Sequence, residues 1–97
     1  MTLRESEESL QNKVIDLLKL GRWVYFHSWS SRHSVAGFPD IIAIRGTRVL
    51  AIELKSTKGK LTPAQIAWGQ TFTATGKVEY YCWYSEDWDE MVKALAR

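Results

Sequence analysis

Two apolar runs joined by a two-residue turn constrain the fold of this chain more than any other feature of its sequence. The runs cover residues 41–45 and 48–54, and Gly46 and Thr47 stand between them. A two-residue loop with Gly at its first position is typical of a type II′ turn, which joins the strands of an antiparallel hairpin. The sequence therefore predicts a hairpin whose register is fixed by this turn.

Two carboxylates face each other at the open end of the predicted hairpin. Counting outward from the turn places Asp40 opposite Glu53, and directly opposed side chains have Cβ atoms about 4.5 to 5.5 Å apart. Carboxylates this close repel each other unless one is protonated or a cation bridges them. Lys55 lies two residues beyond Glu53 and therefore on the same face of the strand.

A divalent metal between the two carboxylates is the interpretation that we favour. Mg²⁺ takes oxygen ligands and is commonly held by one or two carboxylates together with waters and phosphate. The alternative is a surface hairpin in which Asp40 begins a turn while Glu53 and Lys55 add solubility. The facing acids, the almost wholly apolar strands and the basic flanking loops count against that alternative.

Hydrophobic periodicity and turn residues predict the order α-β-β-β-α-β-α for the whole chain. This order indicates an α/β fold in which helices flank one sheet. The expected elements are a helix over about 5–20 that Gly21 ends, strands within 22–29, 41–45 and 48–54, a helix from 63 that Gly76 ends, a strand over 77–84 and a final helix that Ser85 caps.

The second predicted helix begins with a capping box. Thr62 precedes Pro63 at the first helical position, and Gln65 stands where the side chain of a capping box returns to the cap. We expect Ile66 and Phe72 to point inward from this helix.

Length and composition indicate one compact domain spanning residues 1–97, because the chain has 97 residues, 45% of them hydrophobic and 25% charged. The first residues, MTLRESEESL, are charged, and no run of about 18 apolar residues occurs, so we expect neither a signal peptide nor a membrane span. We therefore expect an intracellular protein, in the cytoplasm of a bacterial or phage-infected cell. The lone Cys82 has no disulfide partner and is expected in the core.

Charge is unevenly distributed along the chain. Residues 22–60 carry a formal charge of +5, whereas the remainder carries −3. A basic central segment suits a polyanionic partner such as a nucleic acid, although solvated loops are often basic for solubility alone.

Several sequence segments together resemble a known nuclease family. Pro39 and Asp40, followed by Glu53 and Lys55 within "ELK", are similar to the signature of the PD-(D/E)XK nuclease superfamily. The segments "GFPD", "ELK", "GKLTPAQIAW" and "DWDEM" resemble its VRR-NUC (virus-type replication-repair nuclease) branch along nearly the whole chain. The resemblance implies a single restriction-endonuclease-like domain with a mixed central sheet flanked by helices.

The same resemblance implies an activity, a cofactor and a substrate. Members hydrolyse DNA phosphodiesters with Mg²⁺ or Mn²⁺, and short stand-alone members act on branched DNA such as four-way (Holliday) junctions in repair. Two alternatives stay open: a less selective nuclease that cuts flaps, ends or plain duplex, and a DNA-binding module with a decayed site. The intact set of Asp40, Glu53 and Lys55 argues against the decayed site.

The resemblance also assigns roles to the hairpin residues. Asp40, Glu53 and the backbone carbonyl of Leu54 would hold the metal, while Lys55 would orient the attacking water and stabilise charge in the transition state. Lysine acts as a base only if its pKa is lowered, so positioning is the role that we assign to Lys55.

Two further candidates come from the predicted helices. Glu7 shares a helical face with the apolar residues of the first helix, and the resemblance places a glutamate of this helix near the metal, with Glu8 as the alternative. Gln65 is either the capping-box residue or, by the resemblance, a group beside the metal and phosphate. Both roles can hold only if its side chain is shared or switches when substrate binds.

DNA contacts and assembly complete the predictions. Arg32, Lys58 and Lys60 flank the acidic residues and are candidates for contacts to phosphate, although a solvated loop is the simpler interpretation for each alone. Five tryptophans are many for so short a chain. A homodimer would bury some of this aromatic surface and present two active sites to the strands of a junction.

Overall fold

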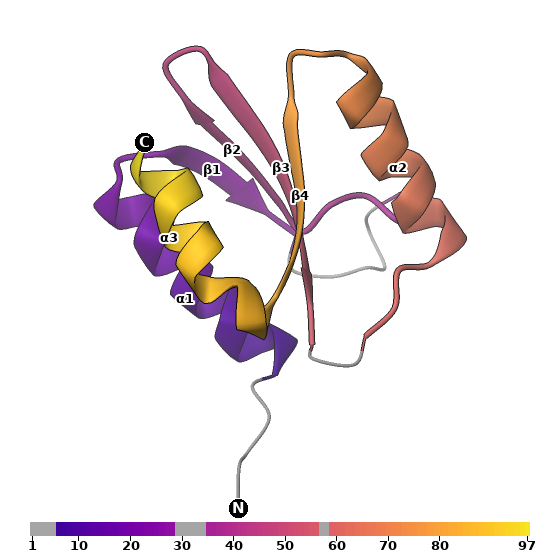
Figure 1. The fold of residues 1–97 in the computed structure, drawn as a ribbon, viewed down its shortest axis with the longest axis horizontal. Coiled ribbons are helices and arrows are strands. Elements are labelled where there is room, and N and C mark those ends of the chain that lie inside the picture. Colours follow the sequence, from indigo (N-terminus) through magenta and orange to yellow (C-terminus); the bar gives the residue numbers. More distant parts are fainter. Residues whose placement is uncertain (1–5, 29–34, 57–58) are drawn as a thin grey trace, which may run out of the picture.

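A computed structural model describes residues 6–28, 35–56 and 59–97 of the chain. The element order is the predicted α-β-β-β-α-β-α, with one additional short 3₁₀ turn (Figure 1). The elements are α1 (Glu7–Leu20), β1 (Val24–His27), β2 (Ile41–Arg45), β3 (Arg48–Lys55), α2 (Pro63–Ala74), β4 (Glu79–Tyr84), the 3₁₀ turn η1 (Ser85–Asp87) and α3 (Trp88–Ala96).

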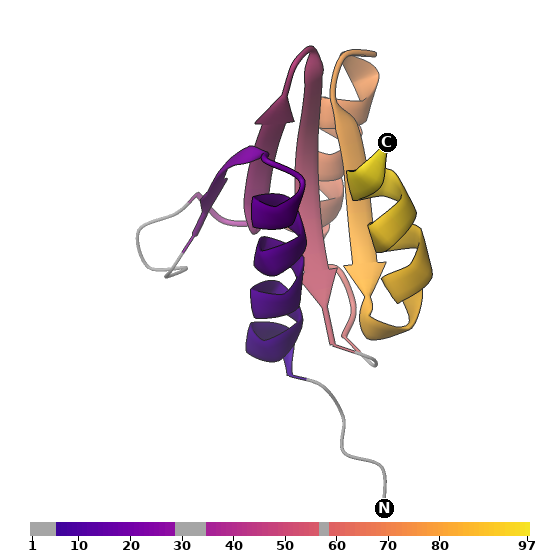
Figure 2. The same cartoon turned by 90° about the vertical axis from the view of Figure 1, so that its left-hand side faces the viewer.

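The four strands form one mixed sheet in the order β1-β2-β3-β4. Strands β1 to β3 are antiparallel neighbours, whereas β4 runs parallel to β3 because α2 carries the chain back between them. Figures 1 and 2 show α1 and α3 together on one face of the sheet and α2 on the opposite face. The predicted mixed sheet with flanking helices is confirmed.

The β2–β3 hairpin has the predicted register. Arg45 pairs with Arg48 across the turn, and the pairing continues to Ile41 and Ile52. Gly46 has φ of 62°, the positive value that the first position of a type II′ turn requires. Turn chemistry thus sets the register of the whole hairpin, including its open end.

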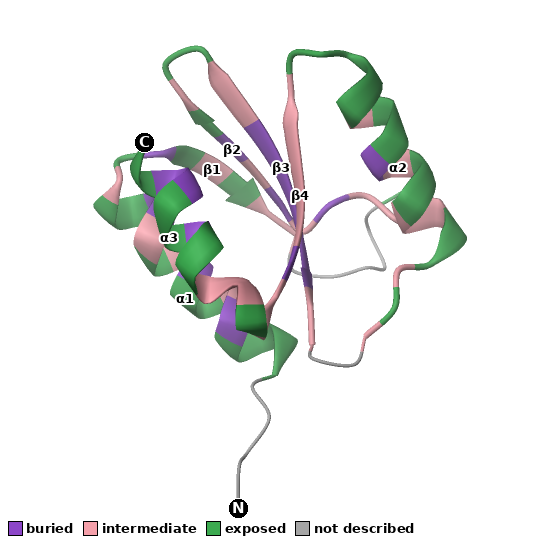
Figure 3. Ribbon diagram, in the orientation of Figure 1, coloured by how far each residue is buried: buried purple, intermediate pink, exposed green. Residues whose placement is uncertain are grey.

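The main core lies between the sheet and the helices α1 and α3, where Figure 3 shows the buried segments of these helices in purple. Successive strand residues point to opposite faces, so alternate residues of β3 and β4 face this core. Its buried members include Leu10, Val14 and Leu18 of α1, Leu50, Ile52 and Leu54 of β3, Trp83 of β4, and Met91 and Leu95 of α3.

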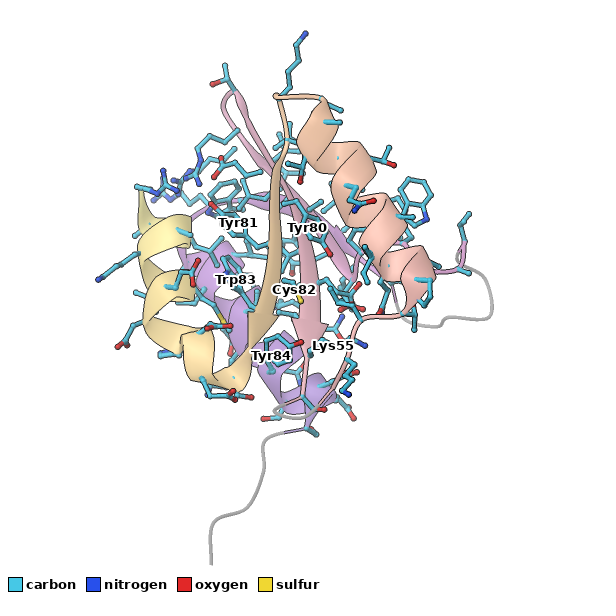
Figure 4. All side chains as sticks on the ribbon, turned by 45° about the vertical axis from the view of Figure 1, so that its right-hand side comes forward. Lys55, Tyr80, Tyr81, Cys82, Trp83 and Tyr84 are labelled. Atoms are coloured by element: carbon cyan, nitrogen blue, oxygen red, sulfur yellow. The ribbon has the colours of Figure 1, made fainter. Side chains whose placement is uncertain are left out.

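The intervening residues of β3 and β4 face α2. Figure 4 shows Tyr81 and Trp83 on the α3 side of β4 and Tyr80 and Cys82 on the α2 side. In the parallel register Glu53 pairs with Cys82 and Lys55 with Tyr84. The acidic residue and the lysine of the hairpin therefore belong to the sheet face that α2 only partly covers.

Helix α2 packs differently from the prediction. Ile66 was expected to point inward, but 44% of it is exposed. Gly69 is the buried residue of this helix, and a Cβ there would lie 2.7 Å from Cε2 of Tyr80. The helix rests on the tyrosine ring at Gly69, which leaves Ile66 at the rim of an open groove beside Tyr80.

The start of α3 also differs from the prediction. Ser85 was expected to cap this helix, but it begins η1, and its buried hydroxyl makes no hydrogen bond with any described residue. The 3₁₀ turn moves the cap position to Asp87, whose carboxylate accepts a hydrogen bond from Tyr84 N at 2.8 Å. Within the described residues, no helix is long and apolar enough to cross a membrane.

Candidate active site

Asp40 and Glu53 meet at the open end of the β2–β3 hairpin, as the register predicts. Asp40 immediately precedes β2, Glu53 belongs to β3, and their carboxyl groups share a hydrogen bond. Glu53 is 3% exposed and is the one charged residue in the buried set of described residues. A buried carboxyl group is costly unless it is paired or neutralised, so its presence here needs an explanation.

The environment of Glu53 strongly favours its neutral form. Burial raises the pKa of Glu53 to about 9, and the hydrogen bond to Asp40 and the negative charge of Asp40 act in the same direction. The positive charge of Lys55 opposes this shift, and the negative charge of Glu7 adds to it. Without a cation, the carboxyl pair therefore retains one proton at neutral pH.

Asp40 is held firmly in place by the backbone around it. Its Oδ2 accepts a hydrogen bond from Leu54 N at 2.8 Å, and its carbonyl accepts one from Ser28 N at 3.0 Å. The carboxylate thus continues the hydrogen-bond ladder of β3 beyond the start of β2. Because the N–H and C=O of one strand residue point to the same edge, the Leu54 carbonyl also lies on the Asp40 side.

Glu7 reaches this end of the sheet from the first turn of α1. Its Oε1 accepts a hydrogen bond from Ser56 N at 3.3 Å, directly after Lys55. Of the two glutamates considered for this helix, Glu7 thus contacts the end of β3. Glu8 is exposed.

The donor set suits a hard cation held mainly by two carboxylates. Among the described residues, no group of three or more His, Cys, Asp and Glu side chains is close enough to hold a metal. Asp40, Glu53 and the Leu54 carbonyl offer oxygen ligands only, which is the chemistry that Mg²⁺ or Mn²⁺ takes together with waters and phosphate. Glu7 as a direct ligand stays a prediction.

Comparison with known proteins identifies the family. The family model of the VRR-NUC domain matches residues 5–85 of the sequence. The chain belongs to the VRR-NUC domain family. Family membership makes it a nuclease-type domain with DNA as its substrate, in a family that generally uses divalent metals. The comparison with curated proteins found no match.

The remaining predicted site residues of this VRR-NUC domain are Gln65 and three basic residues. Gln65 forms the predicted capping box, with its Oε1 accepting from Thr62 N at 2.8 Å and its own N donating to Thr62 Oγ1 at 3.2 Å. Its role beside metal and phosphate stays a prediction. Lys60 is exposed after β3, whereas Arg32 and Lys58 lie outside the described residues.

Two arginines of the basic central segment have a structural role far from the carboxyl pair. Arg45 donates to the carbonyls of Gly21 at 3.0 Å and Leu95 at 3.3 Å. Arg48 pairs with Glu79 at 2.8 Å and donates to Ala94 O at 3.1 Å. Both guanidinium groups lie over the ring of Trp23. The turn end of the hairpin thus binds the last carbonyls of α3, and its charges are not at the site.

An aromatic cluster beside the site was not predicted. Phe38, two residues before Asp40, has its ring centroid 5.0 Å from that of Trp68 and 6.0 Å from that of Phe72 on α2. Trp68 Nε1 donates to Ala36 O at 3.1 Å. The available signal was the pair of aromatic residues at helical spacing, since Trp68 and Phe72 lie one turn apart on one face.

Proposed function

We propose that this VRR-NUC domain, taken as a single domain over residues 1–97, is a metal-dependent DNA endonuclease that hydrolyses phosphodiester bonds with Mg²⁺ or Mn²⁺. We propose branched DNA, such as four-way junctions, as its preferred substrate. The observation that carries the proposal is the buried Glu53 carboxyl against Asp40, an arrangement costly for stability and suited to a bound cation.

Some of the site residues would hold the metal, and others would orient the metal ligands or the substrate. Asp40, Glu53 and the Leu54 carbonyl would hold the cation, and the Leu54 N–H keeps the Asp40 carboxylate oriented. A bound divalent cation supplies charge for the scissile phosphate and lowers the pKa of a coordinated water. Glu7, the first residue of α1, would add a third acidic side chain near the end of β3, where it accepts a hydrogen bond from Ser56 N.

Lys55 is proposed to position the attacking water and to stabilise negative charge that develops on the phosphate. It lies on the same strand face as Glu53, and its positive charge is felt by that carboxyl group. The positively charged Lys55 side chain is repelled by a metal cation and is therefore not expected to be a ligand. It can instead contact water and phosphate. Gln65 would approach the same phosphate if its side chain left Thr62 when substrate binds.

DNA would be held through its phosphates. Lys60 is exposed and lies five residues after the end of the strand that carries Glu53 and Lys55. Together with Arg32 and Lys58, it would supply sequence-independent contacts that release counterions.

A homodimer is supported by an apolar strip on the same sheet face as the carboxyl pair. Val24 is 74% exposed, Phe26 is 65% exposed and Ile44 is 43% exposed. The register places Val24 beside Ile44 and Phe26 beside Ile42, so these side chains are neighbours. A second copy on this strip would bury it and bring two sites together. Sedimentation of the wild type and of Phe26→Ser tests this, since the variant should be monomeric.

The deciding experiment is a cleavage assay with Mn²⁺ on labelled four-way junction, flap, duplex and single-stranded DNA, with Asp40→Asn as the control. Cleavage of the junction in preference to the other substrates, absent in the control, is the expected result. Equal cleavage of flap and duplex would support the less selective nuclease. DNA binding without any cleavage would support the decayed site.

A further inference from the structure

The geometry points to Trp68 as a positioning residue for Asp40, acting through the aromatic cluster that it forms with Phe38 and Phe72. This cluster fixes the segment from Ala36 to Pro39 against α2, and the segment in turn sets where the Asp40 carboxylate stands beside Glu53. The inference rests on the proposed function in taking Asp40 as a metal ligand.

The segment before Asp40 lies directly on the backbone of α2. Gly37 has φ of 81°, and a Cβ there would lie 2.4 Å from the carbonyl carbon of Ala64 and 2.6 Å from the nitrogen of Gln65. Two backbones can approach this closely only where a side chain is absent. The first turn of α2 therefore packs against the segment that leads into the site.

Trp68 holds this segment in two ways. Its indole N–H donates to the Ala36 carbonyl at 3.1 Å, and its ring meets Phe38 edge to face with centroids 5.0 Å apart. Phe72 closes the cluster, with its centroid 5.8 Å from that of Trp68. Aromatic pairs in this geometry stabilise a structure beyond the effect of their buried area. Trp68 and Phe72 of α2 thus contact the two neighbours of Gly37: Trp68 contacts Ala36, and both contact Phe38.

Little freedom remains between this cluster and the carboxylate. Only Pro39 separates Phe38 from Asp40, and Pro39 combines a fixed φ with a fully buried ring. A displacement of Phe38 would therefore be passed to Asp40 and would lengthen its 2.8 Å hydrogen bond to Leu54 N.

The aromatic cluster is a second contact that holds α2, in addition to the contact of Gly69 with Tyr80. Apart from Gly69, every residue of α2 is at least partly exposed, and Figure 1 shows the helix standing alone on its face of the sheet. The cluster therefore ties two parts of the site together, because α2 carries Gln65 and the preceding segment carries Asp40. Groups that orient metal ligands typically change metal affinity or activity by about 10- to 100-fold when removed.

The test measures the placement of Asp40 directly and without metal. Amide hydrogen exchange by NMR in EDTA follows the Leu54 amide, whose hydrogen bond goes to Asp40, with the Leu50 amide of the same strand as internal reference. The variants are Trp68→Leu, which removes the aromatic contacts and the N–H, and Trp68→Phe, which removes the N–H and one ring of the indole but keeps an aromatic side chain. Trp88→Leu is the matched control, because Trp88 is another half-buried tryptophan but packs with the core on the opposite face.

We expect Leu54 to exchange at least about tenfold faster relative to Leu50 in Trp68→Leu, less so in Trp68→Phe, and unchanged in Trp88→Leu. Mn²⁺ affinity should fall about 10-fold or more in Trp68→Leu and stay unchanged in Trp88→Leu. Unchanged Leu54 exchange in both Trp68 variants, or an equal effect of Trp88→Leu, would overturn the inference. Because the exchange measurement needs no metal, it decides the matter even if the wild type fails to bind Mn²⁺ or to cut DNA.

Discussion

Replacing Glu53 by Gln should stabilise the metal-free protein, because the wild type must keep a buried carboxyl group protonated. The pKa of this group is raised from 4.5 to about 9. Between these values the folded state holds a proton that the unfolded state has lost, so wild-type stability falls as pH rises. Each pH unit costs about 1.4 kcal/mol, which gives about 3 kcal/mol at pH 7. Gln carries no such cost and can donate its amide to Asp40.

Urea denaturation followed by circular dichroism, in EDTA at pH 5, 6, 7 and 8, measures this difference. We expect Glu53→Gln to be more stable than the wild type by about 2 to 3 kcal/mol at pH 7, with the gap closing toward pH 5. With Mn²⁺ the wild type should become more stable than Glu53→Gln, because the cation binds the folded wild type but not the variant and so stabilises only the wild type.

Glu79→Gln is the matched control on the neighbouring strand. Hydrogen bonding to Arg48 lowers the pKa of Glu79 to about 2, so its charged form favours the fold, and stability is lost as pH falls through that value. This variant should therefore be less stable than the wild type at pH 7. If Glu53→Gln were as stable as the wild type at every pH, or less stable, the account of Glu53 as a buried carboxyl kept for metal would be refuted.

The other predictions concern cleavage, backbone geometry and DNA binding. Lys55→Ala should keep Mn²⁺ binding but lose about 10² to 10³ in single-turnover cleavage rate, and a rate within a fewfold of the wild type would make Lys55 a bystander. Gly37→Ala should lower the free energy of unfolding by about 2 to 4 kcal/mol, against about 1 to 2 kcal/mol for Gly46→Ala, because only Gly37 meets another backbone; equal losses in urea titrations would contradict this. DNA affinity in Ca²⁺ should fall steeply with salt, with a log–log slope reduced by about 1 in Lys60→Ala, and a flat salt dependence would remove the phosphate contacts.

The hairpin was predictable because two local rules agree in it. The Gly46–Thr47 turn fixes which residues oppose each other, and strand periodicity then decides which face each one takes. The meeting of Asp40 with Glu53 follows from these rules without any knowledge of the remaining chain. The same periodicity placed Lys55 on the face of Glu53.

The packing of α2 could not be predicted in the same way, because its sequence has no clear apolar face. Ile66 looks like a core residue, yet the contact of Gly69 with Tyr80 decides how the helix lies. The roles of Arg45 and Arg48 were hidden for a similar reason. Their partners are carbonyls of α3 that lie far away in sequence, and charge counting cannot tell a structural arginine from one that binds DNA.

Calorimetric titration of the wild type and of Asp40→Asn with Mn²⁺ tests the central claim most directly, namely that Asp40 and Glu53 share a divalent cation. At pH 7, repeated in buffers of different ionisation enthalpy, the wild type should bind Mn²⁺ and release about one proton, since the cation displaces the proton that Glu53 retains. Asp40→Asn should show no binding. Unchanged affinity in Asp40→Asn would contradict the claim.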